Sequence, residues 1–200
     1  MATKTKDIRG SRTEKLLVAS YMAESMAYSR YTFYAKQADK DGFPPISRIF
    51  TLTAANELHH AKVFFKFLQG GRVSKEMTID SGVIGTTLDN LKTAASEEQA
   101  EGVVAYTEAA KVAREEGFED IALVFESIAT IELHHEERFR RFIKHLEDGT
   151  LYKREFPVKW QCLVCGYVYE GTEPPTECPA CSHPQKYYMD VTEMSDALTD

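Results

Sequence analysis

Glu57-Leu-His-His60 and Glu132-Leu-His-His135 are two copies of one four-residue segment, 75 positions apart in a chain of 200 residues. The similarity extends outward from both copies. Residues 31–69 and 106–144 share 16 identical positions of 39, whereas unrelated segments of average composition share about two or three. The chain therefore contains a duplicated unit, and we expect any site that it builds to take residues from both copies.

The apolar residues around each copy recur with the period of a helix. Ser11 and Glu14 have the S-x-x-E spacing of a capping box, which predicts a helix start. Gly42 with Pro44-Pro45, then Gly70-Gly71, Gly117 and Gly149, are the expected breaks. The predicted helices span about residues 11–39, 46–68, 86–116 and 119–147. Two short turns and one long connection over 72–85 predict an all-α four-helix bundle.

The composition changes near residue 150. Five of the seven prolines and all four cysteines follow it. We therefore predict two domains, a helical bundle over residues 1–150 and a small metal-bound β/loop domain with a C-terminal tail over 151–200.

Carboxylates and imidazoles are spaced to share helix faces. Glu57 and His60 are three residues apart, as are Glu132 and His135, so each pair lies on one face beside an apolar stripe. The other two predicted helices carry glutamates at corresponding places. Glu24 lies 33 residues before Glu57, and Glu98, with Glu101 after it, lies 34 before Glu132. His59 and His134 are one position off this face, and we expect ordinary packing or surface positions for them.

Whether these glutamates are buried decides between a metal site and ordinary surface charges. Five inward carboxylates would cost several kcal/mol or more each without compensating positive charge, and no inward lysine or arginine accompanies them, with Arg30 the nearest candidate. Two divalent metals would supply that charge. Carboxylate and imidazole ligands suit iron or manganese better than copper, with zinc an alternative. The other reading, solvent-facing charges on long helices, fits a single Glu-x-x-His better than a duplicated one.

The cysteines form two C-x-x-C units, Cys162–Cys165 and Cys178–Cys181. Each unit offers two thiolates from one tight turn, and two such units predict a tetrahedral metal site. Gly166 follows the first pair, where we expect its amide to hydrogen-bond a cysteine sulfur. The thiolates alone leave zinc, in a structural ribbon, and iron equally open.

Charge and hydropathy exclude several classes of protein. The net charge of −7 argues against binding to nucleic acid or to an anionic membrane. No segment approaches the ~20 apolar residues of a membrane helix, and the N-terminus MATKTKDIRG lacks the apolar region of a secretory signal. We therefore expect a cytoplasmic protein with reduced cysteines.

Taken together, these motifs resemble the rubrerythrins, which join a ferritin-like di-iron bundle to a rubredoxin-like domain. The resemblance runs from about Arg12 to Tyr188. It is carried by Glu24-Ser25 with Arg30-Tyr31, by both Glu-x-x-His pairs, by Glu98-x-x-Glu101, and by Lys159-Trp-x-Cys-x-x-Cys-Gly-Tyr167 with Cys178-Pro-Ala-Cys181.

The resemblance implies a role for each residue. Glu57 and Glu132 would bridge two irons, with Glu24 a terminal ligand of the first and Glu98 and His135 ligands of the second. Glu101 would bind the first iron when it is oxidised, and His60 when it is reduced. Tyr31 and Tyr106 would hydrogen-bond ligand carboxylates. A third iron would be bound by Cys162, Cys165, Cys178 and Cys181.

The function implied by the resemblance is reduction of hydrogen peroxide to water, as protection against oxidative stress. Electrons from NAD(P)H would arrive through a separate reductase or rubredoxin, since the chain has no Gly-rich nucleotide motif. A head-to-tail homodimer is implied as well. One alternative is a ferroxidase or iron-handling protein, against which the cysteine domain argues. Another is an electron carrier or zinc-ribbon module on a scaffold bundle, against which the buried carboxylates argue.

Overall fold

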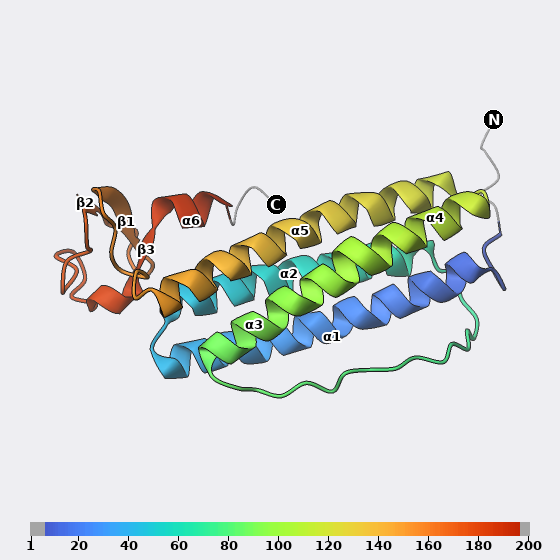
Figure 1. Ribbon diagram of the computed structural model, residues 1–200, viewed down its shortest axis with the longest axis horizontal. Coiled ribbons are helices and arrows are strands. Elements are labelled where there is room, and N and C mark those ends of the chain that lie inside the picture. The colour runs from blue at the N-terminus through green and yellow to red at the C-terminus, as the bar shows by residue number, and fades with distance from the viewer. Residues whose placement is uncertain (1–6, 197–200) are drawn as a thin grey trace. The chain divides into compact units, whose positions relative to one another are not determined.

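The computed structural model describes residues 7–196, apart from the side chains of 101–103, 195 and 196. Figure 1 shows the long helices α1 (Arg12–Asp41), α2 (Pro44–Phe67) and α5 (Glu119–Glu147), with a third helical run between α2 and α5. That run consists of α3 (Thr87–Glu98), a π-helical segment η1 (Gln99–Tyr106) and α4 (Thr107–Glu115). The predicted four helices are therefore confirmed, and α5 has the predicted bounds.

Helix α1 begins at the predicted cap but with a different partner for the glutamate. The Glu14 amide donates to Ser11 Oγ at 2.9 Å, as in a capping box. The Glu14 carboxylate, however, accepts from the Gly10 amide at 2.7 Å rather than from Ser11. The cap therefore extends one residue further toward the N-terminus than the motif predicts.

Both copies of the repeat end their first helix in the same way. Gly42 and Gly117 have φ of 89° and 75°, which glycine adopts without strain. The residues that follow each donate a backbone hydrogen bond to the helix end, Phe43 to Ala38 O and Phe118 to Ala113 O, both at 2.8 Å.

The predicted start of the second helix was wrong by two residues. Pro44 and Pro45 were expected to lie before it, but they form the first turn of α2. Proline is tolerated there because the first amides of a helix have no intrahelical acceptor, and its fixed φ already suits the helix.

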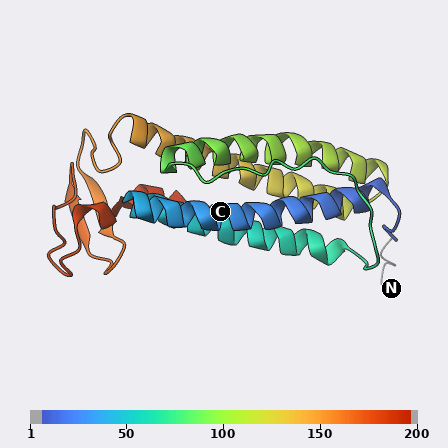
Figure 2. The same cartoon turned by 90° about the horizontal axis from the view of Figure 1, so that it is seen from below.

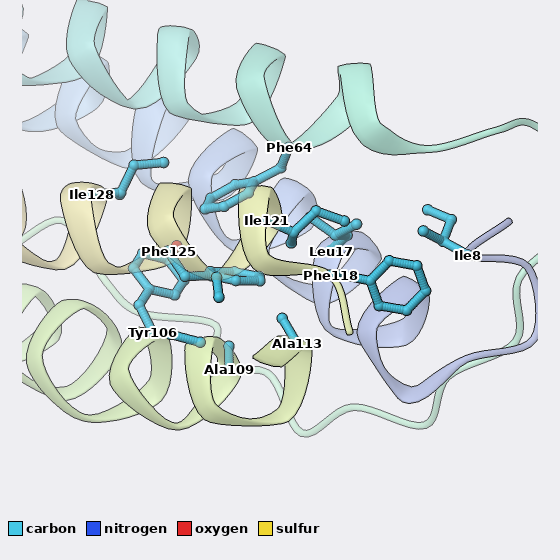
Figure 3. Packing of buried hydrophobic residues seen from close by; sticks show 12 residues of the cluster. Ile8, Leu17, Phe64, Tyr106, Ala109, Ala113, Phe118, Ile121, Phe125 and Ile128 are labelled. Carbon is cyan, nitrogen blue, oxygen red and sulfur yellow. The ribbon is translucent and has the colours of Figure 1, made fainter. Parts of the chain in front are cut away.

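The chain packs into two compact units, each built from segments of the helices. The first unit holds residues up to 30, 53–83 and 96–136, and the second holds 31–52, 84–95 and 137 onward. Figure 3 shows the apolar core of the first unit, where Phe64, Tyr106 and Phe125 pack with ring centroids 5.1–5.8 Å apart. An aromatic cluster of Tyr31, Tyr34, Phe50 and Phe139 fills the second.

The second unit also contains a small antiparallel sheet. Strands β1 (Val158–Cys162), β2 (Val168–Gly171) and β3 (Tyr188–Asp190) are ordered β2-β1-β3, with Trp160 opposite both Tyr169 and Asp190. A short 3-10 turn η2 (Gln185–Tyr187) precedes β3, and α6 (Val191–Asp196) follows it. Figure 2 shows these strands beyond the C-terminal end of α5. The predicted domain boundary near residue 150 stays a prediction.

Ion pairs join α6 and β3 to the end of α5 and the linker. Glu193 contacts His145 Nε2 at 3.2 Å and Arg141 Nε at 3.3 Å, and Asp190 pairs with Arg154 at 3.1 Å. The Arg154 guanidinium also lies 5.1 Å from the ring centre of the buried Trp160. Among the described helices, none is long and apolar enough to cross a membrane.

Candidate metal centres

Six predicted ligands of the bundle lie together inside the first unit. Each helix of the bundle supplies at least one of them. All are at most 7% exposed, and they are Glu24 on α1, Glu57 and His60 on α2, Glu98 at the end of α3, and Glu132 and His135 on α5. The spacing of three within each Glu-x-x-His turns both side chains to one face, which explains why all four residues of the two pairs point inward.

These residues form two overlapping groups of four ligand atoms. One consists of Glu24, Glu57, His60 and Glu132, and the other of Glu57, Glu98, Glu132 and His135, with the atoms of each group within 4.8 Å of one another. Glu57 and Glu132 belong to both groups. A pair of cations at these two places would therefore share two carboxylates, one from each copy of the repeat.

Both histidines turn Nδ1 toward the shared carboxylates. His60 Nδ1 lies 2.9 Å from an oxygen of Glu57 and 2.9 Å from an oxygen of Glu132. His135 Nδ1 lies 3.1 Å and 2.8 Å from oxygens of the same two glutamates. One Nδ1–H can donate to only one oxygen, and Oε1 of each glutamate is buried without a hydrogen bond. Such orphaned oxygens are costly unless a cation binds them.

Without metal, several groups of this cluster have raised pKa values. Burial, followed by the negative charges of Glu132 and Glu57, raises the pKa of Glu24 well above its usual range. Burial and Glu132 raise the pKa of Glu98 to about 7. Burial lowers the pKa of His60, but hydrogen bonds to Glu132 and Glu57 outweigh it and bring the value to about 9. Burial also raises the pKa of the shared Glu57 and Glu132, but the charge and hydrogen bonds of His135 and the hydrogen bonds of His60 outweigh it and lower both values. Protons on the other groups thus offset part of the negative charge, as divalent cations would.

The donor set fits such cations. Two groups of oxygen and imidazole ligands, with no thiolate, suit iron or manganese. The geometry therefore agrees with the predicted pair of metals, and each predicted bundle ligand whose side chain is described takes part in it.

The two predicted tyrosines differ in what the structure describes. Tyr106 donates its hydroxyl proton to Glu24 Oε1 at 2.5 Å, in the buried core of the first unit. Tyr31 belongs to the second unit, where it is buried against Phe50 and Phe139. A hydrogen bond from Tyr31 to a ligand carboxylate stays a prediction.

The third helical run contains a feature that sequence analysis missed. Residues Gln99–Tyr106 are π-helical, and Glu101 lies within them, although its side chain is outside the described residues. A signal was present in the repeat. Glu24 and Tyr31 are seven residues apart, whereas Glu98 and Tyr106 are eight apart. A π segment absorbs one extra residue inside a helix, and such segments are frequent at functional sites.

Two charged residues on α5 were also missed as buried groups. Glu136 is 7% exposed and Arg138, in the second unit, is 1% exposed. The repeat indicated that both positions face inward, because their counterparts 75 positions earlier are the uncharged Ala61 and Val63. The expectation that no inward lysine or arginine accompanies the glutamates of the site stays a prediction. Arg30, the predicted nearest cation, instead pairs with Glu97 and donates to the Asp80 carbonyl at 3.0 Å.

The four cysteines form the second centre, within the second unit. Their sulfurs lie within 4.8 Å of one another, with Cys162–Cys181 and Cys165–Cys178 both at 3.7 Å. Gly166 has φ of 80°, which its turn requires. Its amide donates to the Cys162 carbonyl at 2.9 Å, whereas sequence analysis expected a cysteine sulfur as acceptor. Four thiolates in this arrangement fit one tetrahedral iron or zinc.

Comparison with known proteins gives matches over nearly the whole chain. Residues 15–143 and 89–160 match the family described as Rubrerythrin, and residues 160–189 match the family described as Rubrerythrin, rubredoxin-like domain. The chain is 45% identical over 183 residues to rubrerythrins of Porphyromonas gingivalis and Nitratidesulfovibrio vulgaris. Each match covers 92% of this chain, with 92% and 96% of the respective relatives.

Solved structures give a consistent result. Fully reduced nigerythrin superposes with a TM-score of 0.62 at 27% identity, over 95% of this chain and 91% of that one. A bacterioferritin of Desulfovibrio desulfuricans superposes with a TM-score of 0.59 at 23% identity, over 68% of this chain and 81% of that one. The second likeness concerns the fold alone.

Proposed function

The chain belongs to the rubrerythrin family, which combines a ferritin-like di-iron carboxylate bundle with a four-cysteine rubredoxin-like iron site, and on that premise we propose that it reduces hydrogen peroxide to water. The observation that carries the proposal is the presence of both centres in one chain. The reaction consumes two electrons and two protons for each peroxide and yields two waters. When bound, two ferrous ions would supply one electron each.

We assign the bundle ligands as follows. Glu57 and Glu132 would bridge the irons because both belong to the two ligand groups. Glu24 would complete the ligand set of the first iron. Glu98 and His135 would complete that of the second. His60 belongs to the first group, and it would alternate there with Glu101 as the oxidation state changes.

The catalytic residues we propose are Glu101, His60, Tyr31 and Tyr106. Tyr106 holds a proton on its hydroxyl, directed at Glu24, next to the place where peroxide oxygens would need protons. Its ring packs against Phe64 and Phe125, and these contacts restrict its orientation. The burial of the carboxylates strengthens their interaction with the cations.

The cysteine site would relay electrons from a separate donor, either a rubredoxin or a reductase linked to NAD(P)H. It passes one electron at a time, so it would act twice per peroxide. We further propose a head-to-tail homodimer in which one chain's cysteine site serves the partner's bundle. The proposed compartment is the cytoplasm, where four free thiols remain reduced, and the role is protection against oxidative stress.

Stopped-flow mixing of the fully reduced, full-length protein with peroxide tests the proposal. We expect about one peroxide consumed per bundle in the first turnover, because two electrons are stored there. With an external reductase, consumption should continue for many cycles. The double variant Cys178→Ser, Cys181→Ser should complete the first turnover and then stop.

The alternative function, a ferroxidase, predicts a different result. Ferrous iron would then be the electron source, and the cysteine variant would oxidise added ferrous iron as fast as the unchanged protein. Equal steady-state peroxide consumption by the two proteins would contradict the relay. Sedimentation of a fully active monomer at working concentration would contradict the dimer.

A further inference from the structure

The two histidines of the bundle site, His60 and His135, differ in which side chain contacts their Nε2 atom. Asn56, four residues before His60 on α2, places the Nδ2 atom of its side-chain amide 3.3 Å from Nε2 of His135 on α5. Among the described side chains, which leave out 101–103, none hydrogen-bonds Nε2 of His60. Polar side chains in the described part of the chain therefore contact His135 on both sides of its ring and His60 on the metal side only.

The repeat explains this difference. The counterpart of Asn56, 75 positions later, is Ile131, four residues before His135. By the symmetry of the duplicated unit, Ile131 is the residue that would meet His60, and it has no polar atom. Asparagine in one copy and isoleucine in the other break the symmetry immediately before the identical Glu-Leu-His-His segments.

The protons of His135 set the direction of the hydrogen bond. A neutral imidazole that binds metal through Nδ1 carries its proton on Nε2 and must donate it. Asn56 can meet this demand because a half-turn of its amide presents Oδ1 instead of Nδ2. An acceptor at this position selects the tautomer that leaves the Nδ1 lone pair free.

We propose that Asn56 is the positioning residue of His135, accepting the Nε2–H hydrogen bond that holds its ring and tautomer for metal binding, while Ile131 leaves His60 without such a partner. This inference rests on the ligand set assigned under the proposed function. Its consequence is one firmly held imidazole, at the second iron, and one that is free to leave the first.

Metal binding tests this with cobalt(II) as the probe. The cysteine site is first filled with zinc(II), and the full-length protein is then titrated with cobalt(II) while its absorption bands are followed. Asn56→Leu should weaken one of two cobalt sites by about 10- to 100-fold and leave the other unchanged. Asn56→Asp, which can only accept, should bind within a few-fold of the unchanged protein. Ile131→Leu is the matched control and should change neither site.

The histidine proton gives an independent readout. In nitrogen-15 NMR spectra of the zinc-loaded protein, His135 should show a slowly exchanging Nε2 proton that Asn56→Leu loses and Asn56→Asp keeps. The inference is overturned if Asn56→Leu binds cobalt as the unchanged protein does, or if Asn56→Asp is as weak as Asn56→Leu. Fewer than two cobalt sites in the unchanged bundle would instead overturn the ligand set itself.

Discussion

At Glu116, one carboxylate caps a helix that begins more than a hundred residues earlier. Its Oε2 accepts from the Thr13 amide at 2.8 Å and the Thr13 hydroxyl at 2.6 Å, and Oε1 accepts from the Arg12 amide at 3.1 Å. These are the first amides of α1, which have no acceptor within the helix. Burial raises the pKa of Glu116, but the hydrogen bonds from Thr13 and Arg12 outweigh it and lower the value to about 2.

Replacement of this cap should destabilise the protein in a pH-dependent way. Glu116→Ala should cost about 1–2 kcal/mol of unfolding free energy near neutral pH. Folding lowers this pKa from 4.5, so the contribution is complete above about pH 4.5 and disappears as the pH falls toward 2. Urea unfolding of the metal-free protein across this range measures it. Glu115→Ala, which removes an exposed partner of Arg12, should cost about 0–1 kcal/mol, and an equal loss would contradict the capping role.

Tyr106→Phe removes one hydroxyl and keeps the ring that packs against Phe64 and Phe125. We expect both bundle metals to remain bound and the single-turnover rate with peroxide to fall by about 10-fold or more, because Glu24 loses its proton donor. Stopped-flow absorption measures this rate. Tyr21→Phe, which alters a tyrosine packed on Phe65, is the control. An unchanged rate in Tyr106→Phe would remove this tyrosine from the mechanism.

At the scale of elements, the π segment η1 accommodates one residue more than α1 has between its glutamate and tyrosine. Deletion of Gly102 would restore the seven-residue spacing of Glu24 and Tyr31. We expect an uninterrupted α-helix with Glu98 and Tyr106 still buried, and stability equal to or slightly above that of the unchanged protein, since π turns are unfavourable.

The matched control is deletion of Lys111 from the regular helix α4. That deletion rotates everything on one side of it by about 100° and should destabilise the bundle strongly. Circular dichroism during thermal unfolding distinguishes the two deletions. Equal destabilisation by both would show that η1 is not a one-residue insertion.

At the scale of the whole molecule, two separate ligand sets predict three irons per chain. The bundle set contains carboxylates and imidazoles, and the other contains four thiolates. Elemental analysis of protein from iron-replete cells should give about three irons per chain. The variant Cys178→Ser, Cys181→Ser should retain about two. Zinc at the cysteines together with an iron-free bundle would contradict the redox function.

The contacts of Glu193 connect the C-terminal helix to the end of α5. Burial raises the pKa of Glu193, but the hydrogen bond to His145 and the charge of Arg141 outweigh it and lower the value. We expect Glu193→Gln to speed hydrogen exchange in 191–194 above about pH 4.5. Below that pH the unchanged protein should approach the variant, because the carboxylate itself becomes protonated. Lys153→Gln, which removes an exposed pair with Glu173, should leave this exchange unchanged.

The sequence by itself determined the four helical runs of the bundle, the duplicated Glu-x-x-His and the paired C-x-x-C units, and it predicted which glutamates of the bundle lie together. Each of these is a matter of spacing along one segment, where helical period and turn chemistry act locally. Glycine at positions 42 and 117 ended helices as predicted for the same reason. The resemblance to rubrerythrins followed from these spacings and was confirmed over most of the chain.

Only the tertiary structure decided which groups meet. It showed that Glu57 and Glu132 are the shared carboxylates, that Asn56 reaches His135, and that Glu116 caps α1. It also placed Arg138 inside and Pro44 within a helix. The contacts between groups depend on distances between side chains from different helices. A spacing rule within one helix contains no information about those distances, because packing of the whole core sets them.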